Sequence, residues 1–146
     1  MSNMLIGLLA MISCLFIQAM LVVVAMRFYV NHQGLVDTPS FSSTLGLITA
    51  VMVLLVIGNF VQIILWGLLF MYLGEFTDLT TAVYHSAVNF ATLGYGDIVM
   101  SEERRILGPM QSINGVLMVG VSTAVMMSAL QDAMQRTRKA RGMGLE

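Results

Sequence analysis

The sequence predicts an all-α membrane protein. Hydrophobic residues occupy 58% of its 146 positions and charged residues 10%, whereas soluble domains are about 45–50% apolar and about 25% charged. Charged side chains are absent from residues 1–26, 38–74 and 106–131. Each of these stretches is longer than the ~20 residues that cross a ~30 Å hydrocarbon layer. Three membrane-spanning helices are therefore expected, at residues 4–26, 45–73 and 106–130.

The first span has two other readings, which its sequence disfavours. A secretory signal would begin with a basic segment and have a short apolar centre, but residues 1–3 carry no basic side chain and the run is long. A voltage sensor would need several regularly spaced Arg or Lys residues inside the span, and only Arg27 lies at its edge. Residues 30–43, which include Gly34 and Pro39, are predicted to form a loop or short surface segment.

The distribution of charge predicts how the chain is oriented. Four of the seven basic residues follow the last span, namely Arg136, Arg138, Lys139 and Arg141. Such an excess marks the cytoplasmic side, so the C-terminus is expected inside and the N-terminus outside. The basic tail is expected to meet anionic lipid headgroups. Residues 74–105 then lie outside, where acidic residues outnumber basic ones and would concentrate cations.

Within the outer segment, residues 78–91 predict a helix too short to cross the membrane. The stretch has no Gly or Pro, and at 1.5 Å per residue it would reach about 20 Å. Thr77 is the expected N-cap, with Asp78 in the first turn near the positive end of the helix. The C-terminal end would then direct its partial negative charge inward, just before Thr92.

Residues 92–97 read Thr-Leu-Gly-Tyr-Gly-Asp. Backbone carbonyls in an extended segment can supply rings of oxygens that replace the water around a K⁺ ion. Successive carbonyls can all face one side only if some residues adopt positive φ, which Gly94 and Gly96 do without steric cost. Non-helical backbone at membrane depth must be buried in protein or line a watery cavity, so the flanking helices are expected to enclose this segment.

These residues resemble the pore module of the tetrameric potassium channels, particularly the small bacterial two-transmembrane members. The resemblance rests on the TLGYGD motif, the preceding amphipathic helix with Tyr84 and His85, and the following helix with Gly115 and Gly120. It implies an outer helix, a re-entrant pore helix, a selectivity filter and an inner helix, here preceded by one extra transmembrane helix. One chain carries one filter segment, so the resemblance implies a homotetramer with four-fold symmetry.

The resemblance also implies a role for each filter residue. K⁺ ions would be coordinated by the Thr92 hydroxyl and carbonyl and by the carbonyls of Leu93, Gly94 and Tyr95, with no other cofactor. Gly96 would permit the final turn, and the Tyr95 ring would act as an outward spacer. Asp97 would sit behind the outer mouth and seek a donor from the pore helix. The sequence departs from the family in three places, where Leu93 replaces Val, Ala91 replaces a second Thr and Met100 replaces Pro.

The family often has acidic or tryptophan partners for the residue at Asp97, but here Tyr84, His85 and Val88 occupy the corresponding stretch. If the His85 imidazole donates to Asp97 or to a neighbouring backbone carbonyl, external pH would alter the stability of the filter, because an unperturbed His has a pKa of ~6.5. The other reading makes His85 an aromatic-sized filler on the pore helix.

The last span is polar enough to line a pore. Helical periodicity places Val116, Val119 or Gly120, Thr123 and Met127 on one stripe. Thr123 would line a wet cavity, and Met127 would either form a hydrophobic constriction or pack between helices. Gly115 and Gly120 are either hinges or close-packing positions. Pro109 lies inside the helix if Ser101 caps it, and in the first turn if the helix begins near Gly108.

The sequence thus predicts three regions: an extra transmembrane helix and its connection at 1–44, an ion channel pore module at 45–135 and a basic cytoplasmic tail at 136–146. The expected function is passive, K⁺-selective conduction across a membrane, expected to be a bacterial inner membrane. The alternatives are a weakly selective cation channel and a non-conducting regulatory or structural subunit. Two histidines, one cysteine and no Gly-rich phosphate loop give no basis for catalysis or nucleic-acid binding.

Overall fold

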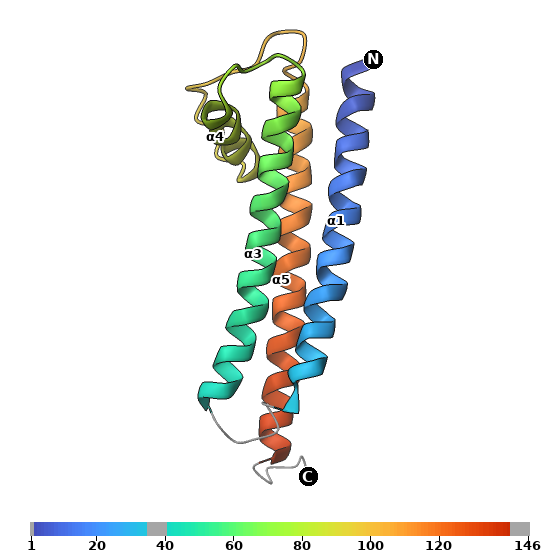
Figure 1. The fold of residues 1–146 in the computed structure, drawn as a ribbon, viewed down its shortest axis with the longest axis vertical. Coiled ribbons are helices and arrows are strands. Elements are labelled where there is room, and N and C mark those ends of the chain that lie inside the picture. Colours follow the sequence, from blue (N-terminus) through green and yellow to red (C-terminus); the bar gives the residue numbers. More distant parts are fainter. Residues whose placement is uncertain (1, 35–40, 141–146) are drawn as a thin grey trace. The chain divides into compact units, whose positions relative to one another are not determined.

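A computed structural model describes residues 2–34 and 41–140, and this part of the chain forms four helices (Figure 1). They are α1 (Ser2–His32), α3 (Phe41–Tyr72), α4 (Leu79–Phe90) and α5 (Leu107–Ala140). Three of them, α1, α3 and α5, are long and apolar enough to cross a membrane, whereas α4 is the short helix. The predicted all-helical membrane fold is therefore confirmed.

The helices extend beyond the apolar stretches that predicted them. Helix α1 continues to His32, α3 begins at Phe41 and α5 continues to Ala140, so residues 30–32 and 41–43 of the predicted loop are helical. Gly and Pro are the residues that most often interrupt a helix. Neither occurs between Arg27 and His32, so α1 continues beyond its apolar stretch. The rest of the predicted loop up to Ser40, with Pro39, lies mostly outside the described residues, as does Arg141 of the basic tail.

Pro109 lies in the first turn of α5, because that helix begins at Leu107. The preceding residues form turns in which the Arg105 amide donates to the Ser101 carbonyl and the Leu107 amide to the Arg104 carbonyl. First-turn amides have no partner within the helix, so a proline there costs no hydrogen bond. The second of the two readings of Pro109 is therefore the right one.

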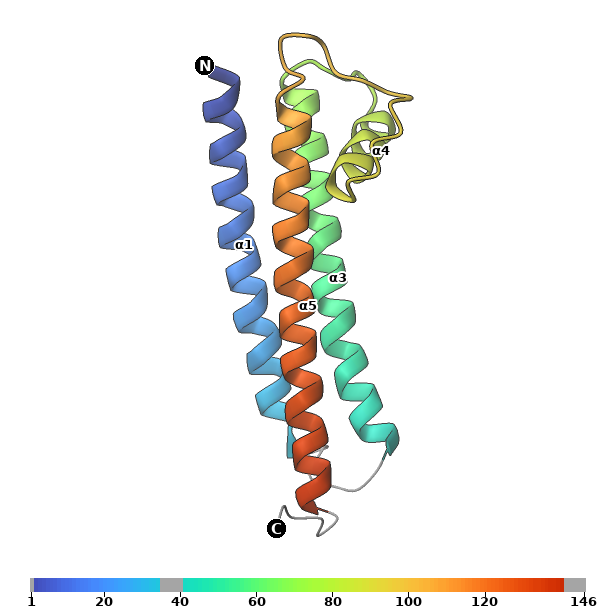
Figure 2. The ribbon, with the colours of Figure 1, turned by 180° about the vertical axis from the view of Figure 1, so that it is seen from behind.

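The chain divides into two compact units. The first unit comprises residues 1–18 and 58–120, and in it α4 lies beside α3 and α5 (Figure 2). One apolar cluster of this unit joins Cys14, Trp66, Phe70 and Leu107. A second joins Ile63 of α3, Phe90 of α4 and Met118 of α5. Helix α4 is thus held by apolar contacts with both neighbouring long helices.

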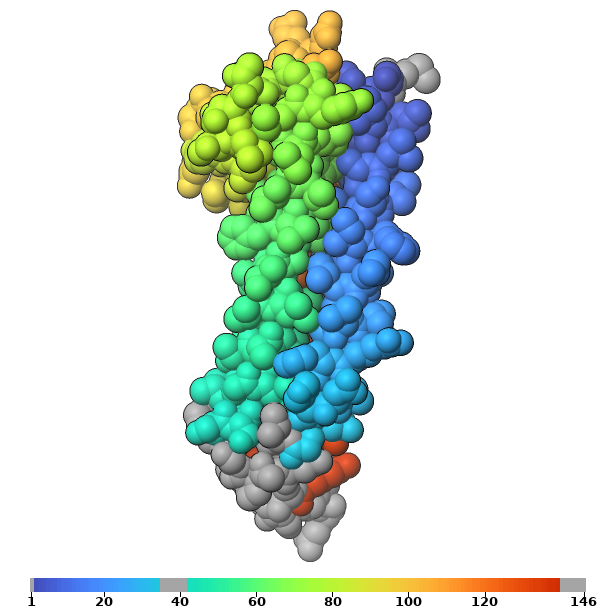
Figure 3. Space-filling view, viewed as in Figure 1, coloured from blue at the N-terminus to red at the C-terminus, as the bar shows by residue number. Residues whose placement is uncertain are grey.

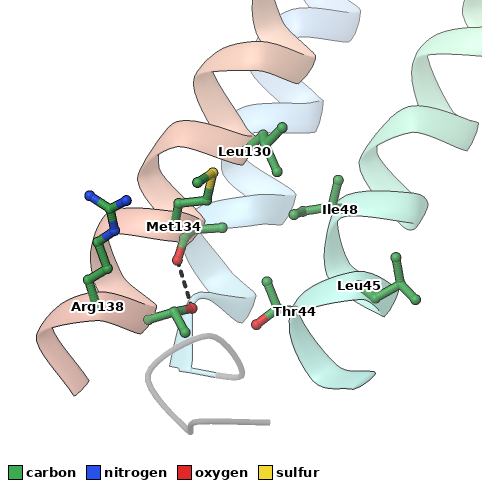
Figure 4. A pocket seen from close by; sticks show the side chains of 8 residues that line it. Thr44, Leu45, Ile48, Leu130, Met134 and Arg138 are labelled. Carbon is green, nitrogen blue, oxygen red and sulfur yellow. Dashed lines mark hydrogen bonds between the residues drawn. The ribbon is translucent and has the colours of Figure 1, made fainter. Parts of the chain in front are cut away.

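The second unit comprises residues 19–57 and 121–146. Its core is made of aliphatic, small and aromatic side chains, namely Ala25, Tyr29, Leu47, Ile48, Val51, Leu55, Ala129 and Ala133. A groove of about 340 Å³ lies between α3 and α5 of this unit and is lined by side chains that include Ile48, Leu130 and Met134 (Figure 4). Arg138 is the charged residue of its lining.

Candidate functional site

The site begins with the cap of α4. The Asp78 side chain accepts a hydrogen bond from the Thr81 amide at 2.8 Å, and its backbone is extended (φ −113°, ψ 132°). Asp78 is therefore the N-cap, and the prediction that Thr77 would cap the helix was wrong. Hydrogen bonds from Thr81 hold the pKa of Asp78 below its usual value. A negatively charged carboxylate at the N-terminus of α4 interacts favourably with the positive end of the helix dipole.

The other end of α4 closes in a Schellman turn. The Leu93 amide donates to the Val88 carbonyl and the Thr92 amide to the Asn89 carbonyl, both at 2.9 Å. This pattern requires a left-handed residue after the cap, a position that glycine normally fills. Here Thr92 fills it, with a φ of 58°. Among the described residues, Thr92 is the one non-glycine with positive φ.

The motif loop alternates between two kinds of backbone. Thr92, Gly94 and Gly96 have positive φ, at 58°, 61° and 72°, while Leu93 and Tyr95 between them do not. The sequence indicated the two glycines but gave no signal for Thr92. In this single chain residues 91–97 are all exposed, including 55% of Leu93 and 65% of Tyr95. The segment thus combines alternating backbone geometry with exposure of every residue from 91 to 97.

Tyr84 and Asp97, predicted to support the outer mouth, contact each other. The Tyr84 hydroxyl donates to the Asp97 carboxylate at 2.6 Å. This hydrogen bond lowers the pKa of Asp97 and raises the pKa of Tyr84. The donor that Asp97 was expected to find on the pore helix is therefore the Tyr84 phenol. The bond ties the last residue of the motif to the middle of α4.

His85 is buried, with 7% of its surface exposed, and packs against the rings of Phe70 and Phe76. Its Nδ1 lies 3.0 Å from the Ile98 carbonyl oxygen, and its Nε2 lies 2.9 Å from the Asn89 amide nitrogen. A carbonyl only accepts and an amide nitrogen only donates, so the neutral ring carries its proton on Nδ1. Burial lowers the pKa of His85. Both of its ring nitrogens are satisfied in the neutral form.

A carboxylate that the sequence did not single out holds the segment after the motif. Glu75 accepts from the Ser101 amide and hydroxyl, both at 2.7 Å, and from Arg104 at 3.0 Å. Burial of the carboxylate pulls the pKa of Glu75 upward, but these hydrogen bonds and the Arg104 charge outweigh it and lower the pKa. The end of α3 is thereby fastened to the start of the turn that leads into α5.

Helix α5 contacts α4 closely. Gly115 lies so near the end of α4 that a Cβ there would overlap the Phe90 carbonyl. No heavy atom of the described residues lies within 4 Å of the corresponding position at Gly120. One turn before Gly115, Gln111 donates to the Ser86 hydroxyl, which donates to the Ile63 carbonyl at 2.6 Å. Gly115 is thus a close-packing position, a role that the sequence left open.

The predicted pore-facing stripe of α5 is exposed in the single chain. In the first unit Val116, Val119 and Gly120 are exposed, and in the second unit Thr123 and Met127 are exposed. Other positions of the same helix are buried, including Gln111, Asn114 and Met118. Their alternation follows the helical period, so the stripe is the side of α5 that its own chain leaves open.

A family model described as "Ion channel" matches residues 60–132, which is half of the 146 residues. The match begins inside α3, includes α4 and the motif loop and ends inside α5. Comparisons with curated proteins and with solved structures gave no match. The matched family is that of the two-transmembrane potassium channel pores, and the three membrane-capable helices fit such a module with one extra helix. The protein is therefore an integral membrane protein that belongs to this ion channel family.

Proposed function

We propose that the protein conducts K⁺ passively and selectively through a pore formed by four copies of residues 92–97. The observation that carries the proposal is the backbone of this loop, in which every second residue from Thr92 to Gly96 has positive φ. Such an alternation lets successive carbonyls face one side, as a stack of oxygen rings requires. The coordinating residues would be Thr92, Leu93, Gly94 and Tyr95.

The direction of α4 supports the proposal. The helix ends at Phe90, immediately before the loop, so the partial negative charge of its C-terminus lies next to Thr92. A cation that has lost its water would be stabilised there. The acidic Asp97, whose pKa is lowered by Tyr84, would keep its negative charge near the outer mouth and attract cations.

The surface of the single chain supports assembly into a homotetramer. Leu93, Tyr95 and Val99 are 55%, 65% and 73% exposed. Beside them lies a cavity of about 400 Å³, lined by residues that include His85, Gly94 and Pro109. An open apolar loop next to an open cavity suits contact with a second copy, and only a closed ring of copies would surround an ion.

The orientation and the pore lining complete the proposal. By the positive-inside rule, Arg136, Arg138 and Lys139 near the end of α5 favour a cytoplasmic C-terminus. With three crossings the N-terminus would lie outside, and the expected membrane is a bacterial inner membrane. The module at 45–135 would conduct, with Val119 and Thr123 lining the cavity and Met127 constricting it.

Flux measurements on purified protein in lipid vesicles test the function. The proposal predicts K⁺ flux that Na⁺ does not match, and loss of selectivity in Gly94→Ala, because φ is 61° at that position. Gly46→Ala is the matched control, since Gly46 lies in α3 with open space around it. Equal K⁺ and Na⁺ fluxes would instead indicate a weakly selective cation channel. Absence of flux would indicate a non-conducting subunit. A native mass of four 16.0 kDa chains tests the tetramer.

A further inference from the structure

The first unit contains a cluster of buried, uncharged polar side chains where three helices meet. We call it the amide cluster, and its members are at most 2% exposed: Gln18 of α1, Gln62 and Trp66 of α3, and Gln111 and Asn114 of α5. On α3 the members are four residues apart and on α5 three apart, so each pair lies on one helix face. The buried Cys14 thiol, one turn before Gln18, lies against Asn114 and Trp66.

Hydrogen bonds satisfy only part of this cluster. Gln62 donates to the Gln18 carbonyl oxygen at 2.8 Å, and Gln111 donates to Ser86. Apart from the neighbouring Cys14 thiol, which is only a weak hydrogen-bonding group, five buried polar atoms have no hydrogen-bond partner within residues 2–34 and 41–140. They are Gln62 Oε1, Gln111 Oε1, Trp66 Nε1, Asn114 Oδ1 and Asn114 Nδ2.

Exchanging the oxygen and nitrogen of an amide does not remove the deficit. Both side-chain atoms of Asn114 lack a partner, so turning that amide over leaves the same two atoms unpaired. Within the hydrocarbon layer no bulk solvent reaches such atoms, and leaving them unpaired is costly. The cluster therefore requires a ligand that both donates and accepts hydrogen bonds.

The chemistry of the cluster defines this ligand. Two of the five atoms, Trp66 Nε1 and Asn114 Nδ2, are donors, and the other three are acceptors. The amide cluster carries no formal charge, so an ion would bring uncompensated charge into the membrane interior. Water is small and neutral, and it binds buried polar groups that otherwise lack partners, with about three hydrogen bonds each.

We propose that the amide cluster is an internal water-binding site that joins α1 to α3 and α5. Two further contacts fasten the same part of α1: Asn3 donates to the Glu103 carbonyl at 2.6 Å, and Gly7 lies against the Met110 side chain. Figure 3 shows this part of α1 against α3 on the surface of the first unit. Residues 2–18 of α1 are thus an integral part of the unit that carries the motif loop, whatever the protein conducts.

Trp66 provides a direct probe, because it is the only tryptophan in the chain. NMR of the whole protein, with the indole labelled with ¹⁵N, should show one indole N–H signal with a magnetisation-transfer cross peak to water. Absence of that cross peak in the unaltered protein would overturn the proposal, because the site would then be dry. This measurement requires no variant.

Two variants sharpen the test. Asn114→Leu removes two of the five unpaired atoms, so the water cross peak should weaken or vanish and the Trp66 fluorescence should shift to shorter wavelength. Asn31→Leu is the matched control, since Asn31 is exposed in the other unit, and it should leave both signals unchanged. If Asn114→Leu behaves as the control does, Trp66 is not hydrated through this cluster and the proposal fails.

Discussion

The two compact units are stabilised by different kinds of contact. Of the seven buried polar residues in the described part of the chain, six lie in the first unit: Gln18, Gln62, His85, Ser86, Gln111 and Asn114. The core cluster of the second unit consists of hydrophobic side chains. Hydrogen bonds are directional and fix geometry, whereas apolar packing is not directional. The unit that must hold a loop in one conformation is thus the unit with buried hydrogen bonds.

The largest expected effect comes from Gly115→Ala in the first unit. Its Cβ would overlap the Phe90 carbonyl, and backbone must move to relieve the overlap. We expect a loss at the upper end of the ~1–3 kcal/mol typical of overpacking, or more, measured by thermal unfolding together with K⁺ flux. Gly120→Ala, which has open space, should change stability little. Equal stability of the two variants would show that the close approach of Gly115 to Phe90 does not limit the packing of α5 against α4.

Gln18→Leu should have the next largest effect, because it leaves the Gln62 amide without its 2.8 Å partner. An unpaired buried amide costs about 1–3 kcal/mol. Gln18→Leu/Gln62→Leu should recover much of this loss, and a double-mutant cycle of unfolding free energies measures the coupling. Gln33→Leu in the second unit is the matched control. Strictly additive effects would mean that the hydrogen bond contributes nothing.

Tyr84→Phe removes the donor to Asp97 while keeping the ring. Because both groups are exposed, we expect a small loss of global stability but a few-fold fall in the K⁺-to-Na⁺ flux ratio, since the loop loses a support. Tyr72→Phe is the control, because Tyr72 is 88% exposed at the end of α3. An unchanged flux ratio in Tyr84→Phe would show that the hydrogen bond from Tyr84 to Asp97 does not contribute to ion selectivity.

Asp132→Asn tests a charged contact of the second unit, because an asparagine oxygen can still accept the 2.9 Å hydrogen bond that Asp132 accepts from the Tyr29 hydroxyl. Asp132 lies 2.7 Å from Arg136, one turn away, and their side chains are 42% and 34% exposed. Solvent screens such a pair, so its loss should cost under about 0.5 kcal/mol. Unfolding measured at low and high salt gives this value. If Asp132→Asn lowered the free energy of unfolding as much as Gln18→Leu does, polar contacts would be equally important in the two units, contrary to our expectation.

The smallest effect is expected from pH. Burial lowers the pKa of His85, although the nearby Glu75 and Asp97 carboxylates pull it upward. A lowered folded-state pKa means that stability is complete above the unfolded value of ~6.5 and falls as pH drops through the folded value. Single-channel open probability should therefore stay constant from pH 8 to about 6.5. A change across that range would identify His85 as a pH switch.

The fold could be predicted from the sequence because it follows from hydropathy. Uncharged stretches located all three spans, and the gap between them located α4. Helix ends were harder, because capping depends on backbone angles: Asp78, not Thr77, caps α4, and α1 continues to His32. Hydropathy indicates where a helix is buried in the membrane, but not where it ends.

The candidate site could be predicted only where local sequence determines geometry. The two glycines of the motif indicated positive φ at Gly94 and Gly96, as the structure has it. The Glu75–Ser101 hydrogen bonds, the Ser86–Gln111 hydrogen bond and the close approach of Gly115 to Phe90 join residues far apart in sequence. No local sequence pattern predicts such contacts, because they depend on how the helices pack.

The chain ends two of its helices with the same turn but with different residues. After α3 the left-handed position is held by Gly74 (φ 80°), whereas after α4 it is held by Thr92 (φ 58°). A β-branched residue pays a conformational penalty there that glycine avoids. With K⁺ bound to Thr92 as proposed, the ion would offset that penalty in the folded state alone. By thermodynamic linkage, the free energy of unfolding would then rise with the logarithm of the K⁺ concentration once that concentration exceeds the dissociation constant.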